Sequence, residues 1–361
     1  MSDANELISF IASMSGEGNL RVEENLGEGY VRLRVSEAER RQAKHDIQHV
    51  EDIVIEMLRN ARDAGADKVY LATTKEEGVR TLLFLDNGSG VPQDMQERIF
   101  DARVTSKLES MKMDRWGVHG RGMALFSIKQ NTDEARVVSS GVDLGSSFKV
   151  RVATERLGER ADQSSWPQAV KDEDGRYVCA RGPHNIIRAA CEFALEELRC
   201  CDVYLGSPSE IAATLYAQAS SRLDTSRLLF IDDECELPVI DRLGLASDAE
   251  DFIRICSGLG LEMSERTAHR ILSGQIKPVR GVTARLLRER DSTSHAPAPI
   301  DLAKDRRGLR IAKDDMAQFS RAVERDFNDL AARYYLNLCG DPKIRVSRDR
   351  ITVTFDLAKE E

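Results

Sequence analysis

Apolar side chains recur every three or four positions across residues 36–64, which is the period of an α-helix with one buried face. Two runs rich in strand-forming residues follow at 68–74 and 81–86, joined by a short charged turn. A polar stretch over 91–119 then leads through glycines into an apolar helix at 120–131, and two further strands flank the turn GVDLG. This order of elements predicts an α+β sandwich in which helices cover one face of a mixed sheet.

The second half of the chain follows a loop-like stretch at 158–176. It continues with an amphipathic helix at 185–199, a strand, and a helix that begins at SPSE; a largely helical last third closes with two short alternating strands within 343–357. We therefore predict four divisions: an N-terminal hairpin-like segment (1–35), the sandwich domain (36–157), an α/β connecting domain (177–245), and a mainly helical C-terminal domain (246–361) with a helix-turn-helix-like stretch at 259–290.

The composition is that of a globular protein with a heavily charged surface, since 41% of the 361 residues are hydrophobic and 31% are charged. No stretch approaches the roughly 20 apolar residues of a membrane span, and the N-terminal residues lack the features of a signal peptide. The seven cysteines form no CxxC pair, so we expect reduced thiols. We expect a cytoplasmic protein without a membrane partner.

Charge is distributed unevenly along the chain. The formal net charge of −9 argues against a protein coated with basic surface for nucleic acid, but basic residues gather between positions 264 and 290. If this stretch forms two helices, part of it can face the phosphates of duplex DNA. A basic helical hairpin packed on its own domain explains the charges equally well, and both readings stay open. The candidate DNA contacts are Arg266, Arg270, Lys277 and Arg280.

In the stretch LFLDNGSGVP, at 83–92, a carboxylate residue ends an apolar strand and two closely spaced glycines follow it. Asp86 is followed by Gly88 and Gly90. A tight turn is one explanation. The other is the floor of a pocket, where Asp86 contacts a polar group and the glycines let a flat ligand lie on the backbone.

Three polar residues of the preceding helix, Glu56, Asn60 and Asp63, share one stripe beside its apolar face. A solvated polar edge would explain any one of them alone. Together they suit a catalytic site that binds a metal ion. The amide oxygen of an asparagine can hold a hard cation, and a carboxylate one turn away can polarise a water.

Glycines also precede the predicted apolar helix at 120–131. Gly120 and Gly122 leave backbone N–H groups and a helix N-terminus available for an anion, although such glycines also serve close helix packing. In the sequence GSS, at 145–147, the hydroxyl of Ser146 either reaches a ligand or caps a turn, and Ser147 competes for the same role.

The ordered set of motifs resembles the GHKL ATPase superfamily (gyrase B, heat-shock chaperones, histidine kinases and MutL) and its Bergerat ATP-binding fold. E-x3-N-x2-D, D-x-G-x-G, G-x-G before an apolar helix and G-S before a strand match it over roughly residues 40–155. The resemblance implies that Glu56 activates the attacking water, that Asn60 holds Mg²⁺, and that Asp86 binds the exocyclic amine of adenine. The other contacts to ATP that it implies are Asp63, Gly88, Gly90, Lys107, Gly120, Arg121, Gly122, Met123 and Ser146. Residues 93–119 would form a mobile lid over the nucleotide, with Arg103, Arg115 and His119 as further candidates for phosphate contact.

Within the superfamily, GRGMALFSI and the continuation into further domains look most like the topoisomerase VI B subunit branch. This resemblance implies a slow, Mg-dependent ATPase that associates on nucleotide binding, as a homodimer or with a partner subunit, in a DNA-processing complex. The alternative is a histidine-kinase-like or chaperone-like ATP-binding protein acting in signalling, or an ATP sensor without hydrolysis. A histidine kinase needs a phosphoacceptor on a separate dimerising domain, and His45 and His49, predicted on the same helix as Glu56, do not supply one.

Overall fold

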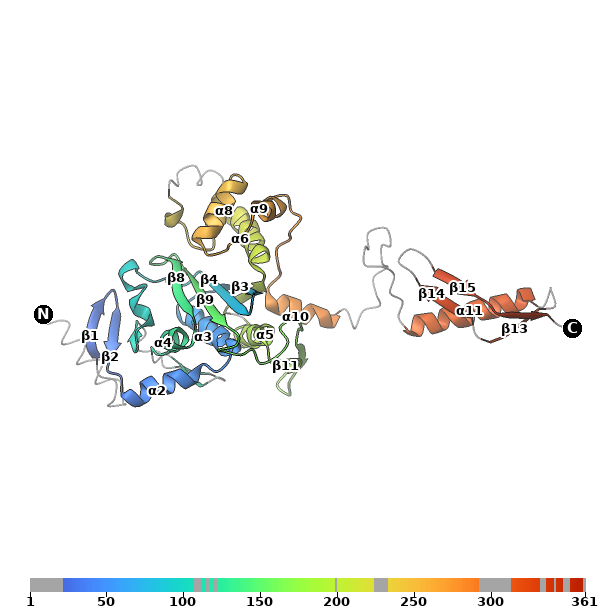
Figure 1. The fold of residues 1–361 in the computed structure, drawn as a ribbon, viewed down its shortest axis with the longest axis horizontal. Coiled ribbons are helices and arrows are strands. Elements are labelled where there is room, and N and C mark those ends of the chain that lie inside the picture. Colours follow the sequence, from blue (N-terminus) through green and yellow to red (C-terminus); the bar gives the residue numbers. More distant parts are fainter. Residues whose placement is uncertain are drawn as a thin grey trace. The chain divides into compact units, whose positions relative to one another are not determined.

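A computed structural model of the chain describes residues 22–106, 112–114, 117–119, 122–198, 200–223, 233–291, 313–331, 336–340, 342–346 and 351–359. The chain divides into two compact units, Met1–Arg290 and Asp291–Glu361. The first unit contains all of the motifs that resemble the GHKL superfamily (Figure 1).

The first unit is organised around a five-stranded mixed sheet with the strand order β12-β3-β4-β9-β8. Strands β3, β4, β9 and β8 pair antiparallel, and β12 lies parallel to β3 at one edge. The strands span Lys68–Glu76 (β3), Val79–Asp86 (β4), Glu134–Ser140 (β8), Ser146–Ala153 (β9) and Asp202–Gly206 (β12). The predicted α+β class and the mixed sheet are confirmed.

Helices α3, α4 and α5 cover one face of this sheet (Figure 1). They span Val50–Asp63, Ala124–Asn131 and Ile186–Glu196. Because side chains alternate along a strand, Leu71 of β3 and Phe84 of β4 point to this face. They are buried in one core with Ile53 of α3 and Phe193 of α5. Within residues 36–157, α3 and α4 therefore lie on one face of the sheet, as in the sandwich that the sequence predicts.

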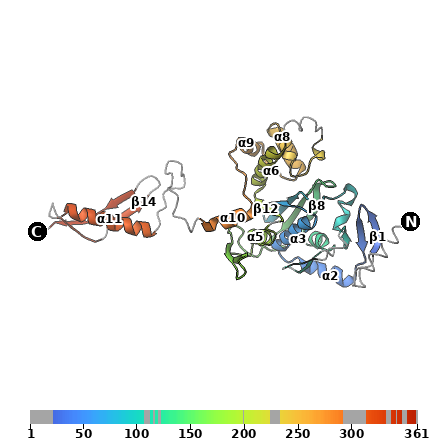
Figure 2. The same ribbon diagram turned by 180° about the vertical axis from the view of Figure 1, so that it is seen from behind.

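Helices α6, α8 and α9 cover the opposite face (Figure 2). They span Pro208–Arg222, Ala249–Gly258 and Glu265–Leu272. Tyr70, the strand neighbour of Leu71, points to this side and is buried with Phe252 of α8 and Ile271 of α9. Residues 177–245 were predicted to form a connecting domain of their own. The structure differs, because β12 takes its backbone hydrogen bonds from β3 and so completes the same sheet.

The single helix predicted over residues 36–64 is two helices, α2 (Glu37–Asp46) and α3. The break falls at Ile47, which adopts an extended backbone and is buried in the core. His49 then starts α3 as its N-cap residue, and its N–H donates to Asp52 Oδ2 at 2.9 Å. A buried apolar residue and a new capping interaction thus interrupt a pattern that looks continuous in the sequence.

Several smaller elements surround the sheet. The N-terminal strands β1 and β2 form a hairpin, as predicted, and β5 adds a third strand to it. Strands β10 and β11 form another hairpin where the sequence predicts a loop boundary. The bounds are Val22–Gly27 (β1), Tyr30–Leu33 (β2), Gln93–Met95 (η1), Arg98–Phe100 (η2), Val104–Thr105 (β5), Lys112–Asp114 (β6), Gly117–His119 (β7), Gln168–Lys171 (β10), Tyr177–Arg181 (β11), Glu234–Glu236 (η3), Arg242–Leu245 (η4) and Val282–Asp291 (α10).

The second unit combines one helix with two pairs of antiparallel strands. Its elements are Lys313–Ala331 (α11), Leu336–Leu338 (β13), Lys343–Val346 (β14), Ile351–Thr354 (β15) and Leu357–Lys359 (β16). The rings of Phe327 on α11 and Phe355 stack with centroids 4.0 Å apart. The two strands predicted within 343–357 are β14 and β15. Across the described parts of both units, none of the helices has the length and apolar character needed to cross a membrane.

Candidate functional site

A cavity of about 450 Å³, called the main cavity below, lies beside α3 at the ends of β4 and β9. Its walls come from α3, from the backbone after β4, from the segment around β5 and from the start of α4. Segments far apart in the sequence thus meet at one place. Of the residues that the sequence singles out, the following line it: Glu56, Asn60, Asp63, Asp86, Gly90, Gly122, Met123 and Ser146.

Asp86 forms part of the floor of the main cavity. It is the last residue of β4, it is only 4% exposed, and it lies opposite Ser146 in the strand pairing. The N–H of Gly88 donates to Asp86 Oδ1 at 2.8 Å, so Gly88 orients the carboxylate rather than lining the cavity. A buried carboxylate held in this way is suited to accept a hydrogen bond from a ligand amine.

Two glycines are required where the backbone after β4 meets the turn before β9. A methyl group on Gly90 would lie 1.8 Å from the carbonyl oxygen of Gly141, and one on Gly145 would lie 2.1 Å from that of Asp86. Both glycines also have positive φ. The sequence marks Gly145 as part of the turn GVDLG and of the G-S motif before a strand, but does not predict its close contact with the Asp86 backbone.

The two serines of GSS separate by strand alternation. Ser146 lines the main cavity, and its Oγ lies 3.1 Å from Ser140 Oγ. Ser147 is fully buried on the opposite side of the sheet, where its Oγ donates to the carbonyl oxygen of Leu259 at 2.8 Å. Ser146 is therefore the serine that lines the main cavity, and Ser147 is a structural residue.

The polar stripe of α3 is held by arginines that the sequence reading missed. Arg59 Nη1 donates to Glu56 Oε1 at 2.8 Å, and Arg62 Nε donates to Asp63 Oδ1 at 3.0 Å. Arg62 also pairs with Glu197 just after α5. Burial lowers the pKa of Arg62, but the two carboxylates outweigh it and hold that pKa above its usual value. The stripe is thus a fixed network of charges.

The segment that begins the predicted lid is tied to α2 and to the start of α4. The N–H of Arg103 donates to the carbonyl oxygen of Gly122, and the Arg103 guanidinium is paired with Glu39 of α2. Glu39 also completes a capping box with Ser36 at the start of α2. Arg103, which the sequence suggested as a phosphate contact, does not line the main cavity. The predicted contacts Lys107, Arg115, Gly120 and Arg121, and the side chain of His119, lie outside the described residues.

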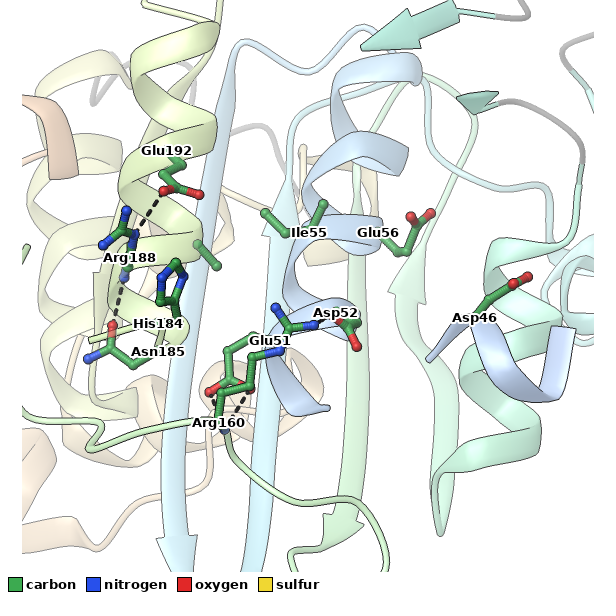
Figure 3. A pocket seen from close by; sticks show the side chains of 11 residues that line it. Asp46, Glu51, Asp52, Ile55, Glu56, Arg160, His184, Asn185, Arg188 and Glu192 are labelled. Carbon is green, nitrogen blue, oxygen red and sulfur yellow. Dashed lines mark hydrogen bonds and ion pairs between the residues drawn. The ribbon is translucent and has the colours of Figure 1, made fainter. Parts of the chain in front are cut away.

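A second cavity, of about 260 Å³ and called the side cavity, lies where α3 faces α5 (Figure 3). Glu51 accepts hydrogen bonds there from the backbone N–H of Arg160 at 3.2 Å and from Gln163 Nε2 at 2.7 Å. Glu56 and Asp46 line both cavities. In Figure 3 the Glu56 side chain points away from α5, so its carboxylate faces the main cavity side of α3.

The oxygen-bearing side chains in the main cavity fit a magnesium ion that takes most of its coordinating oxygens from a bound ligand and water. Among the described residues, no three His, Cys, Asp or Glu side chains cluster as a metal site. Asn60 places one amide-bearing side chain in the cavity, one turn from Glu56. Mg²⁺ commonly keeps several waters and binds through one or two protein oxygens plus substrate phosphates. This donor set therefore suits Mg²⁺ only together with a phosphate ligand.

The described basic residues between 264 and 285 lie on elements that pack into different cores. Helix α9 packs into the core beneath α6 and α8, whereas α10 packs Val282 and Leu286 into the core of α3 and α5. The guanidinium of Arg285 lies 4.0 Å from the ring centroid of Trp166. The four candidate DNA contacts are exposed: Arg266 and Arg270 on α9, and Lys277 and Arg280 in the segment that follows.

Comparison with known proteins identifies part of the first unit. Residues 47–160 match the family described as "Histidine kinase-, DNA gyrase B-, and HSP90-like ATPase". Two curated relatives are the "DNA mismatch repair protein MutL" of Staphylococcus aureus strains Newman and JH1, each 28% identical over 136 residues. The alignment covers 35% of this chain, and the chain spans a fifth of the length of those relatives.

Among solved structures, full-length ShkA in complex with AMPPNP matches with 16% identity and a TM-score of 0.23. That match covers 63% of this chain and 48% of the other, and its TM-score is too low to carry an argument. The family match coincides with the segment that builds the sheet, α3, α4 and the main cavity. Residues 47–160 are therefore similar to the ATPase domain of the GHKL superfamily.

Proposed function

We propose that this chain binds Mg-ATP in the main cavity and hydrolyses it slowly. One observation carries the proposal: buried Asp86 lines the same cavity as Glu56 and Asn60. The backbone around Asp86 requires glycines, and the cavity lies in the segment that matches the family. The volume of about 450 Å³ lies in the range of sites for small molecules and cofactors.

Each residue then has a distinct task. Asp86 accepts a hydrogen bond from the exocyclic amine of adenine, while Asp63 and Ser146 support the base side. Asn60 would hold Mg²⁺, which when bound would neutralise charge on the phosphates. Gly120, Gly122, Lys107, Arg121 and Met123 are the proposed contacts to the phosphates.

Glu56 is the proposed general base. It takes a proton from a water whose oxygen forms a bond to the γ-phosphorus, while the bond from that phosphorus to the β–γ bridging oxygen breaks. The products are ADP and inorganic phosphate, and the proton leaves Glu56 for solvent. The side chain of Glu56 is 22% exposed, so solvent reaches it without rearrangement of α3.

Calorimetric titration with Mg-ATP and Mg-ADP, followed by measurement of phosphate release, tests this proposal. We expect Asp86→Asn to abolish binding and Glu56→Ala to keep binding while turnover is lost. Asp174→Asn, at an exposed turn position, serves as the matched control. A wild-type protein with no affinity for either nucleotide would sink the proposal. Binding without turnover would instead favour a non-hydrolysing ATP sensor.

We further propose that the chain serves a DNA-processing complex and associates through nucleotide-driven lid closure, with the topoisomerase VI B-like branch as the leading comparison. The relatives named as mismatch repair proteins support this context over a histidine-kinase-like or chaperone-like role. Size-exclusion chromatography with a non-hydrolysable ATP analogue should shift the protein to a dimer or, with a partner subunit present, to a heteromer. A monomer under both conditions contradicts nucleotide-driven association.

A further inference from the structure

Arg59 is a charged residue of α3 that lines the main cavity and to which the proposed function gives no task. It lies between Glu56 and Asn60 in the sequence and is only 2% exposed. Its Nη1 donates to Glu56 Oε1 at 2.8 Å, one helical turn back. Because a guanidinium does not lose its proton in proteins, this contact places a permanent positive charge beside the proposed base.

The pair restricts how Glu56 can move. A glutamate side chain loses up to about 2 kcal/mol of rotamer freedom when it is fixed, and a base that is free to rotate spends little time in the reactive orientation. Arg59 is itself buried on the same helix, at the i+3 position, so it provides a rigid anchor. Held through Oε1, Glu56 can present Oε2 to a water.

We propose that Arg59 is a positioning residue that acts on ATP hydrolysis through Glu56. This inference rests on the proposed function, since it requires Glu56 to be the base. Two other roles are distinguishable from it. A guanidinium that contacts the phosphates directly would contribute to nucleotide affinity, and one that only balances charge within α3 would contribute to stability alone.

These roles differ in the kinetic quantities that they change. A residue that acts through Glu56 lowers kcat and leaves the affinity for ATP unchanged, and its effect disappears when Glu56 is absent. A residue that contacts phosphate lowers affinity, and its effect adds to that of losing Glu56. A purely structural residue lowers the melting temperature and leaves kcat of the folded protein intact.

The test is a double-mutant cycle with Arg59→Met, which keeps the buried stem, and Glu56→Ala, with both nucleotide affinity and single-turnover rates measured. We expect Arg59→Met to lower kcat about tenfold to a hundredfold, part of what general bases contribute, with ATP affinity within about threefold of wild type. The double variant should be no slower than Glu56→Ala, and Arg59→Lys should restore part of kcat. Arg254→Met, which removes an exposed arginine paired with Asp251 at i,i+3 and with Glu234, is the control and should leave kcat unchanged.

Additive losses in the double variant, or a loss of affinity larger than that of kcat, would overturn the positioning role. Unchanged kcat in folded Arg59→Met would overturn it as well. A wild-type protein that binds ATP without turnover removes this inference and leaves nucleotide binding standing. A wild-type protein that binds no nucleotide removes the proposed function itself.

Discussion

Ser146 and Ser147 are neighbours in the chain, yet one lines the main cavity and the other is buried under the end of α8. Strand alternation in β9 produces this separation. Consequently, a hydroxyl on one side of the sheet can act on a ligand while the adjacent hydroxyl fixes a helix on the other side. The two residues are a matched pair for separating function from stability.

Substituting alanine for Ser146 should change ATP affinity, whereas substituting alanine for Ser147 should change the stability of the fold. Ser146→Ala should weaken ATP binding about fivefold, as expected for the loss of one neutral hydrogen bond. Ser147→Ala leaves the buried carbonyl of Leu259 without its donor and should lower the free energy of unfolding by about 1–3 kcal/mol, with affinity unchanged. Calorimetry and denaturant unfolding measure the two quantities. The reverse pattern would show that Ser147 is the ligand contact.

Gly145→Ala should disrupt the main cavity. The added methyl group would collide with the Asp86 backbone, and the positive φ of Gly145 adds strain, so we expect a loss of about 2–4 kcal/mol of stability together with lost ATP binding. Gly158→Ala is the control, because the space around Gly158 is open. Normal ATP affinity in Gly145→Ala would contradict the assigned close contact.

The Glu39–Arg103 pair should make stability dependent on pH in the acidic range. Burial raises the pKa of Glu39, but hydrogen bonds from Ser36 and the charge of Arg103 outweigh it and hold the pKa below its usual value of 4.5. A lowered carboxyl pKa stabilises the fold above the unfolded value, and this contribution is lost as the pH falls through the folded pKa. Glu39→Gln should cost less than about 1 kcal/mol at pH 7, because the pair is partly exposed.

Thermal unfolding of wild type and Glu39→Gln at pH 7 and at a pH below 4 measures this contribution. The difference between the two proteins should shrink at the lower pH. Arg98→Met, which affects an exposed pair with Glu24, controls for general charge effects. A difference that stays constant across this range would mean that the charge of Glu39 has no role in holding the lid segment.

The predicted sandwich domain should not fold well by itself. A fragment of residues 36–157 lacks β12, which pairs with β3, and lacks the helices that bury Tyr70 and Leu85. We expect it to aggregate, because an uncovered apolar face and an unpaired edge strand are both exposed. Residues 22–290 should give a soluble protein with one cooperative unfolding transition. A cooperative, monomeric 36–157 fragment would contradict the shared core.

DNA binding, if it occurs, should depend on the exposed basic residues around α9. The triple variant Arg270→Ala, Lys277→Ala and Arg280→Ala should lose duplex binding and retain ATP affinity. Binding by the wild type should weaken by roughly a decade or more between low and physiological salt, because phosphate contacts release counterions. Arg285→Ala is the control, since Arg285 stacks on Trp166 away from α9. Retained binding in the triple variant would place the contact elsewhere.

Local patterns in the sequence were sufficient for much of the first unit. Alternation and helical periodicity located β3, β4, β8, β9 and α5, and the spacing of Glu56, Asn60 and Asp86 anticipated residues that the structure brings to one cavity. Each of these signals lies within a few residues along the chain.

Features that depend on long-range contacts could not be predicted in this way. The pairing of β12 with β3 joins residues more than a hundred positions apart, and no local pattern marks it. The break at Ile47 depends on burial in a core that only the folded chain creates. No local pattern marks Arg59, because its buried environment is supplied by the neighbouring segments.

The hydrogen bond from Arg103 to Gly122 has a consequence for how this chain can vary in length. It joins the two ends of the intervening segment, so that segment is a closed loop in the sense of polymer physics. The entropy of closing such a loop changes by only about 0.6 kcal/mol for each doubling of its length. Insertions between these two anchors should therefore cost the sheet little stability.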